Sequence, residues 1–268
     1  MRKANDFFSI DGVSLEYRWL GPDPDETPTL VFLHEGLGCV ELWKDFPARA
    51  AEATGLGALV YSRAGYGKSD PCVLPRPLGF MHTEGLVTLP RVLDAAGIRR
   101  AVLVGHSDGA SIALINAGGL RDERLLGLVL MAPHVLVEPI TVESIRAAGE
   151  AYEKTDLRRR LSRYHGDNVD CAFLGWNRAW LHPLFPSWNL EIFLPGIESP
   201  VLLVQGEEDN YGTALQLETI ERGLPAPPEI RVMEGCGHSP FRDQPEATLQ
   251  ALTVFVSGLR TGRGETSS

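Results

Sequence analysis

Short apolar runs alternate with longer segments of helical periodicity along most of the chain. The run at 29–33 is continuous, which is typical of a strand that is covered on both faces of a sheet. Strands are expected at 13–19, 29–33, 58–61, 101–104, 125–131, 200–205 and 230–233. Helices are expected at 42–53, 83–95, 110–117, 213–222 and 245–258. Strands separated by helices predict the α/β class, with a mostly parallel central sheet flanked by helices. Pro90 lies inside the second helix, where proline favours a kink.

One segment, 134–199, breaks this alternation. It predicts short helices at 142–153, 157–164 and 169–181, and it is rich in tryptophan and phenylalanine. We interpret it as a helical cap inserted into the core, because long connections within compact domains are usually functional. The alternative is a solvent-facing extension whose aromatic residues form a small core of their own. The expected division is a core in two parts (1–133 and 200–260), the cap (134–199) and a disordered tail (261–268).

Composition limits the classes of partner. The 268 residues are 44% hydrophobic and 22% charged, with a formal net charge of -10. An acidic balance argues against binding nucleic acid or an anionic membrane surface, but it does not identify a substrate. The chain has no apolar run long enough for a membrane span or a secretory signal, so we expect a cytoplasmic protein. The sequence is compatible with a homodimer.

The cysteines are scattered and form no C-x-x-C pair. We interpret them as reduced thiols, and a disulfide between two of them stays open. They are Cys39, Cys72, Cys171 and Cys236.

A G-x-S-x-G pentapeptide at 105–109 carries the strongest chemical signal. A predicted strand precedes it and a predicted helix follows it, so the turn would project the Ser107 hydroxyl above the edge of the sheet. The alternative is a Gly-rich turn in which Ser107 only caps the helix. The strand–turn–helix context favours the nucleophile.

A serine nucleophile needs a base, and the base needs a third group to orient it. The candidate base is His238, in a Gly-rich loop between the last predicted strand and the last predicted helix. The candidate acid is Asp209, just past the carboxyl end of a strand, where sites collect in open α/β sheets. Glu207 and Glu208 are rivals for that role, and Glu138 is a less favoured alternative.

Acyl transfer also needs donors that face the developing oxyanion. One is the backbone N–H of Asp108, the residue after the nucleophile. The other is expected from the loop at 34–38, with the Gly36 amide as first choice and Leu37 as second.

Taken together, these motifs resemble the α/β-hydrolase superfamily over nearly the whole chain outside the cap. The resemblance rests on the segments 34–38, 62–69, 105–109, 206–209 and 237–240. It implies an α/β-hydrolase fold with a Ser107–His238–Asp209 triad, no cofactor, and a cap that closes over the substrate.

Two acidic residues depart from the family pattern. Glu35 stands where members usually have glycine. Some lactone-cleaving members are similar in having an acidic residue at this place. Asp108 stands where many members have an apolar or amide residue. The Asp108 carboxylate could bond substrate or cap, or it could bond backbone at the start of the helix; we expect the second.

The expected reaction is acyl transfer to water, on a small or medium carboxylic ester or lactone. The same triad would serve a C–C hydrolase of ring-cleavage diketones, and a cofactor-free haloperoxidase or perhydrolase is a further enzymatic rival. A hypothesis of another class is a small-molecule receptor whose triad is not used for catalysis.

We expect an apolar or aromatic substrate bound by Glu35, Trp176, Trp180, Phe173, His82 and Met81. No spacing suggests a metal site, and we expect His34 and His106 to be structural.

Overall fold

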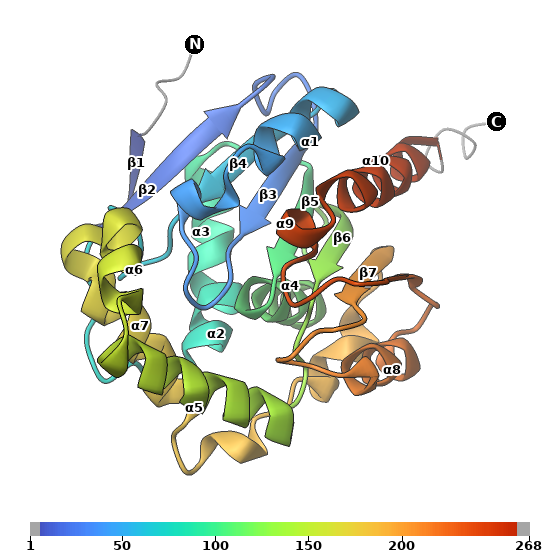
Figure 1. Cartoon of the computed structure of the whole chain (residues 1–268). Coiled ribbons are helices and arrows are strands. Elements are labelled where there is room, and N and C mark those ends of the chain that lie inside the picture. Colours follow the sequence, from blue (N-terminus) through green and yellow to red (C-terminus); the bar gives the residue numbers. More distant parts are fainter. Residues whose placement is uncertain (1–5, 262–268) are drawn as a thin grey trace.

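A computed structural model describes residues 6–261 of the chain. Its centre is an eight-stranded sheet in the order β1-β2-β4-β3-β5-β6-β7-β8 (Figure 1). The strands are β1 (Asp6–Ile10), β2 (Val13–Leu20), β3 (Thr29–Leu33), β4 (Gly57–Tyr61), β5 (Ala101–His106), β6 (Leu125–Met131), β7 (Val201–Gly206) and β8 (Glu229–Met233). The pairs β1–β2 and β2–β4 are antiparallel and all the other pairs are parallel. The predicted α/β-hydrolase fold, with its mostly parallel sheet, is confirmed.

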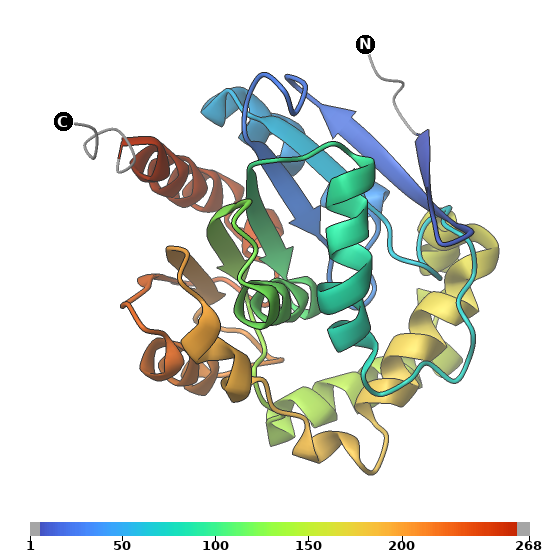
Figure 2. The same ribbon diagram turned by 180° about the vertical axis from the view of Figure 1, so that it is seen from behind.

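Helices cover both faces of this sheet. One face carries α1 (Phe46–Thr54), α9 (Pro240–Asp243) and α10 (Pro245–Thr261). Seen from behind, the other face carries α3 (Leu89–Ala95), α4 (Asp108–Leu120) and α8 (Ala214–Gly223) (Figure 2). Alternate residues of β3 enter opposite cores, with Leu30 and Phe32 on the α1 side and Val31 and Leu33 on the α4 side. A strand buried on both faces therefore has the continuous apolar run that its sequence shows.

The segment between β6 and β7 is helical, as predicted. Its helices are α5 (Pro139–Lys154), α6 (Leu157–His165), η3 (Gly166–Asn168), α7 (Val169–Trp180), η4 (Phe185–Ser187) and η5 (Glu191–Gly196). The helices α5 to α7 lie across the carboxyl ends of the parallel strands (Figure 1). We call α5 to α7 the cap. The last turn, η5, instead packs on α4 of the core, since a Cβ on Gly118 would contact Phe193.

Two expected helices differ from the structure. The helix expected at 42–53 is split into η1 (Val40–Trp43) and α1, because Pro47 favours the first turn of a new helix. The helix expected at 83–95 is three continuous pieces: α2 (Phe80–Thr83), the π-helical η2 (Glu84–Thr88) and α3. Pro90 is the second residue of α3, and the π-helical turn lies directly before it in the continuous helical stretch.

The structure also contains β1, which the sequence reading missed. It pairs with β2 through a two-residue turn at Asp11 and Gly12, both of which have positive φ. Asp-Gly is the preferred sequence for such a hairpin turn, so the signal was present. The predicted tail, 261–268, lies outside the described residues except for Thr261. No helix between residues 6 and 261 has the length and apolar character needed to cross a bilayer.

Candidate active site

Ser107 occupies the sharp turn between β5 and α4. Its φ of 52° and ψ of -120° are unusual for a residue with a side chain, and such strain is often found at functional sites. The glycines on either side make the turn possible. A Cβ on Gly105 would lie 2.6 Å from the backbone of Ala110, and one on Gly109 would overlap the Leu33 carbonyl. The pentapeptide is therefore a steric requirement of this turn, and the turn holds the Ser107 hydroxyl at the sheet edge.

His238 and Asp209 complete a hydrogen-bonded chain from Ser107. The Nε2 atom of His238 lies 3.0 Å from Ser107 Oγ, and its Nδ1 lies 2.8 Å from Asp209 Oδ1. Asp209 also accepts hydrogen bonds from the backbone N–H of Tyr211 and the Gln205 side chain. With Nδ1–H donated to the carboxylate, Nε2 is left to accept the serine proton. This is the geometry that activates a serine hydroxyl.

Burial and pairing set the protonation states of this chain. Burial holds the pKa of His238 below its usual value, although the Asp209 carboxylate opposes that shift. Burial raises the pKa of Asp209, but the hydrogen bond and charge of His238 outweigh it, so the net shift is downward. A neutral imidazole beside an ionised carboxylate is the state that a general base requires.

The expected acids other than Asp209 lie elsewhere. Glu207 and Glu208 are exposed to solvent. Glu138 accepts hydrogen bonds from the N–H and hydroxyl of Thr213 and from Gln216, so it holds α8 against the start of the cap. Among the candidates, only Asp209 contacts His238.

The loop at 34–38 is held beside Ser107 by Arg63, a residue that the sequence reading did not single out. Arg63 is 1% exposed, and its guanidinium donates to the carbonyls of His34 and Glu35 at 2.5 and 3.0 Å. Its backbone N–H also donates to His34 Nε2 at 3.1 Å. A buried guanidinium that satisfies two loop carbonyls fixes the loop in one conformation. Its place in the 62–69 turn, one of the motifs that resemble the family, was the signal in the sequence that could have identified it.

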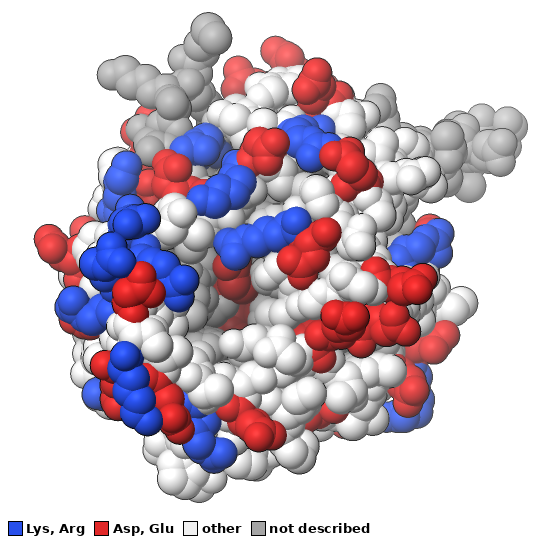
Figure 3. All heavy atoms as spheres, viewed as in Figure 1, with Lys and Arg blue, Asp and Glu red and all other residues white. Residues whose placement is uncertain are grey.

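A cavity of about 270 Å³ opens beside Ser107, between the cap and the core. Figure 3 shows this side of the molecule, which is hollowed near its centre. The cavity is lined by Glu35, Gly36, Leu37, Leu42, His106, Ser107, Leu161, Trp176, Tyr211, His238, Ser239 and Arg242. The expected residues Glu35, Gly36, Leu37 and Trp176 therefore meet around Ser107. Trp176 lies directly against the loop, since a Cβ on Gly36 would overlap its indole ring.

Four residues expected at the substrate are not among those lining this cavity. Met81 is fully buried in the core, and His82 faces Phe193, with ring centroids 5.6 Å apart. Phe173 stacks on Tyr152 inside the cap at 3.7 Å. These side chains pack against other parts of the protein. A sequence pattern does not distinguish such packing residues from residues that line a pocket. Trp180, the fourth, has a different role.

Trp180 connects the cap to the residue after the nucleophile. Its Nε1–H donates to Asp108 Oδ1 at 3.2 Å. The expectation that the Asp108 carboxylate bonds backbone at the helix start is therefore wrong: it bonds the cap. Its other oxygen, Oδ2, is buried and has no hydrogen-bond partner in the described part of the chain. Burial raises the pKa of Asp108 to about 6 against opposing effects of Arg63 and the Trp180 bond.

We expect Asp108→Asn to stabilise the protein more at pH 8 than at pH 5. The pKa of Asp108 is higher in the folded protein than in the unfolded chain, so the native state binds the proton more tightly and loses stability as pH rises through 6. Asparagine keeps an oxygen for Trp180 and removes the buried charge. The advantage of the variant should grow by about 1 kcal/mol between the two pH values, measured by urea unfolding. The exposed Asp167→Asn serves as control and should show no such growth. An equal advantage at both pH values would contradict the prediction.

Several lining residues were missed by the sequence reading. Tyr211 follows Asp209 by two residues, and its ring lies 4.6 Å from that of His238. Arg242 reaches over the site to within 3.9 Å of Glu35. Leu161 comes from the cap helix α6 and Leu42 from η1. Only Tyr211 has a local signal, its place in the acid turn; the others depend on how distant segments pack.

The acidic residue Glu35 has two basic neighbours. Its carboxylate lies 3.5 Å from His106 Nδ1 and 3.9 Å from Arg242. Burial raises the pKa of Glu35, but these neighbours outweigh it and bring the pKa far below its usual value. Glu35 is therefore a fixed negative charge at the cavity wall.

His106 and His34, which were expected to be structural, each contact a backbone carbonyl. His106 Nε2 lies 2.7 Å from the His238 carbonyl, and His34 Nδ1 lies 2.7 Å from the Glu35 carbonyl. Between residues 6 and 261, no three or more His, Cys, Asp or Glu side chains are grouped so that they could hold a metal ion.

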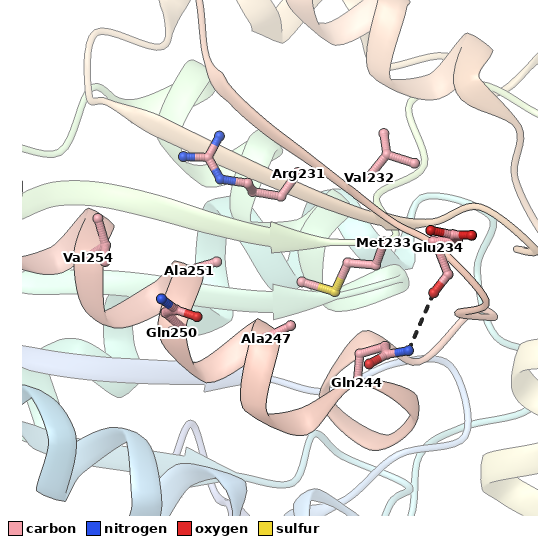
Figure 4. Close-up of a pocket in the computed structure, with 9 residues that line it drawn as sticks. All are labelled: Arg231, Val232, Met233, Glu234, Gln244, Ala247, Gln250, Ala251 and Val254. Atoms are coloured by element: carbon pink, nitrogen blue, oxygen red, sulfur yellow. Dashed lines mark hydrogen bonds between the residues drawn. The ribbon is translucent and has the colours of Figure 1, made fainter.

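A second depression, of about 480 Å³, lies between β8 and α10 (Figure 4). It shares no lining residue with the Ser107 cavity. Gln244 donates a hydrogen bond across it to the Glu234 carbonyl at 3.3 Å, and Arg231 lies along the strand. No serine, cysteine or histidine is among its lining residues.

Comparisons with known proteins agree with this geometry. A sequence model described as the alpha/beta hydrolase family matches residues 30–251. A 2-hydroxy-6-oxo-6-phenylhexa-2,4-dienoate hydrolase from Comamonas testosteroni is 24% identical over 239 residues, 80% of this chain and 82% of that protein. A membrane phospholipase A superposes with a TM-score of 0.76 at 24% identity, over 96% of this chain and 86% of the other. The enol-lactonase from Burkholderia xenovorans LB400 superposes with a TM-score of 0.72 at 19% identity, over 94% and 100%. Structural likeness at these identities shows the fold.

Proposed function

Because the chain belongs to the alpha/beta hydrolase family, we propose that it is a serine hydrolase that cleaves a small carboxylic ester or lactone through an acyl-enzyme. The observation that carries the proposal is the chain Ser107 Oγ–His238–Asp209, with contacts of 3.0 and 2.8 Å. A hydroxyl, a neutral imidazole and a buried carboxylate in this order form the acyl-transfer set.

In the proposed reaction, Ser107 Oγ attacks the carbonyl carbon while its proton passes to His238 Nε2. Asp209 holds the Nδ1–H and stabilises the imidazolium that forms. The N–H of Asp108 lies at the start of α4, where helix N–H groups lack intrahelical acceptors, and it donates to the oxyanion together with the Gly36 amide. The Leu37 amide is the second choice for that partner. Water, activated by His238, then releases the acyl group.

The cavity favours a small substrate. Its volume of about 270 Å³ lies near the lower end of the range for small-molecule sites. Leu37, Leu161 and Trp176 offer apolar contact, which suits a hydrocarbon or aromatic group. Glu35 is a fixed negative charge at the wall, and it disfavours an anionic group beside it.

The experiment is a substrate panel with purified protein. Short aliphatic esters, phenyl acetate, small lactones and a ring-cleavage diketone are assayed side by side, with labelling by a fluorophosphonate probe. The proposal expects labelling at Ser107 and the highest kcat/KM for an ester or lactone. Absence of labelling would favour the alternative of a receptor with an idle triad, because an unactivated serine does not react.

A second candidate is a C–C hydrolase acting on a ring-cleavage diketone. The observation that favours it is the similarity to the relative from Comamonas testosteroni, which is named a 2-hydroxy-6-oxo-6-phenylhexa-2,4-dienoate hydrolase. The same triad can cleave either kind of bond, so its geometry does not distinguish the two functions. The substrate panel does. A kcat/KM for the diketone at least tenfold above that for every ester and lactone would assign this second function.

Ester hydrolysis should keep its full rate at neutral pH. His238 acts as base only when neutral, and burial holds its pKa below 6.5 in the folded protein. Activity is therefore flat at pH 7–8 and falls as pH drops through the lowered pKa. A kcat/KM profile from pH 5 to 9 checks this, repeated on Asp108→Asn to remove the carboxyl that titrates at about 6. An acid limb with its midpoint at pH 7 or above would contradict the assignment.

A further inference from the structure

Two cysteines that are far apart in the sequence meet where the cap joins the core. Cys72 lies in the loop that follows the 62–69 turn, and Cys171 lies in the first turn of α7. Their Sγ atoms are 2.6 Å apart. The backbone N–H of Cys72 donates to Cys171 Sγ at 3.3 Å, so the loop and the helix are aligned at this point. The other two cysteines, Cys39 and Cys236, are fully buried.

The surroundings hold the two sulfurs together. Gly65, with φ of +84°, passes beneath them, and a Cβ there would lie 2.7 Å from Cys171 Sγ and 2.8 Å from Cys72 Sγ. Arg76 donates from Nη2 to Cys72 Sγ at 3.0 Å and to the Ala64 carbonyl at 3.1 Å. A guanidinium beside a sulfur stabilises the thiolate, which is the nucleophile of thiol–disulfide exchange.

We propose that Cys72 and Cys171 form a reversible disulfide that fastens the cap helix α7 to the core. The two sulfurs already adjoin, so the bond needs little backbone movement. The oxidant is a small disulfide such as oxidised glutathione, and the inference does not depend on the substrate of the Ser107 site.

The exchange occurs in two steps. The thiolate of the half-buried Cys72 attacks one sulfur of glutathione disulfide and releases a glutathione thiolate. The Cys171 thiolate then attacks Cys72 Sγ in the mixed disulfide and releases the second glutathione. The two protons lost by the cysteines are taken up by the two glutathione thiolates. The protein thiols are oxidised by two electrons, and one glutathione disulfide is reduced to two thiols.

The link would restrain the part of the cap that covers the site. The helix α7 also carries Trp176, which lines the cavity, and Trp180, which bonds Asp108. Tying its first turn to the core closes a loop between residues 99 apart in sequence. Burial raises the pKa of Cys72 to about 12, against the effect of Arg76. Exchange through the Cys72 thiolate is therefore slow at neutral pH.

The test uses the full chain equilibrated with oxidised glutathione, or with dithiothreitol, and then alkylated. After oxidation we expect two of the four thiols to be lost, a linked Cys72–Cys171 peptide in the mass spectrum, and a Tm roughly 4–8 °C higher. Dithiothreitol should reverse all three. Retention of all four thiols, a link through Cys39 or Cys236, or a link with unchanged Tm would overturn the proposal.

Matched variants separate this pair from general thiol chemistry. The double variant Cys39→Ser/Cys236→Ser keeps the pair and should still form the link and gain the rise in Tm. The single variants Cys72→Ser and Cys171→Ser should gain neither. A rise in Tm after oxidation in either single variant contradicts the assignment. Should a variant fail to fold, the peptide map of the unaltered chain still decides.

Discussion

Replacing Ser107 by alanine is expected to lower kcat for ester hydrolysis about 10⁴- to 10⁶-fold. Alanine removes the only hydroxyl that the described structure places within hydrogen-bond distance of His238 Nε2, 3.0 Å away. The covalent route is then closed, and only binding and oxyanion stabilisation remain. The measurement is kcat with the best ester of the panel, together with loss of fluorophosphonate labelling.

The matched control is Ser111→Ala, one turn further along the same helix. Ser111 is also buried, but its hydroxyl donates to the His134 carbonyl at 2.6 Å and does not line the cavity. We expect its kcat to stay within about threefold of the unaltered protein, with a lower Tm from the lost hydrogen bond. Ser107→Ala that retains more than a hundredth of the activity, while folded, would contradict the proposed nucleophile.

Replacing Asp209 by asparagine should lower kcat about 10³- to 10⁴-fold without unfolding the protein. The groups around this carboxylate are donors: the N–H of Tyr211 on Oδ1, Gln205 Nε2 on Oδ2, and His238 Nδ1. An amide NH₂ therefore faces a donor in either orientation. With its NH₂ toward His238 it favours the imidazole tautomer whose proton is on Nε2, which cannot accept from Ser107.

The control for this change is Glu208→Gln, the adjacent and exposed acid that the sequence offered as a rival. Its activity should match that of the unaltered protein, and KM should change little in either variant. A loss of activity in Glu208→Gln equal to that in Asp209→Asn would mean that the acidic turn acts only through its net charge. Ellipticity and Tm measured on both variants report whether the fold is intact.

The expected layout of the sheet followed from local patterns. Strands such as β3 and β5 are fully buried on both faces, and such burial requires a continuous apolar run. These runs allowed the strands to be predicted from the sequence. Errors occurred where the signal was mixed. The π-helical turn before Pro90 and the break before Pro47 depend on how one proline is accommodated, which periodicity does not report.

The proposed triad could be predicted for a similar reason. Ser107, Asp209 and His238 each follow a strand or its connecting loop at the same edge of a parallel sheet, so strand order brings them together. The glycines at 105 and 109 are required by the close approach of other backbone atoms. Requirements of this kind act over a few residues and are therefore visible in one sequence.

The residues that surround the triad could not be identified in this way. Whether an aromatic residue of the cap lines the cavity, as Trp176 does, or packs inside, as Phe173 does, depends on how α7 is rotated against the core. The bond from Trp180 to Asp108 and the Cys72–Cys171 contact join residues 72 and 99 positions apart. Local periodicity thus establishes the strands, the turn at Ser107 and the order of the proposed catalytic groups. The shape of the cavity, the attachment of the cap and the burial of charged groups were decided only by the tertiary structure. Their energies depend on contacts between side chains that are far apart in the sequence, and no local pattern reports such contacts.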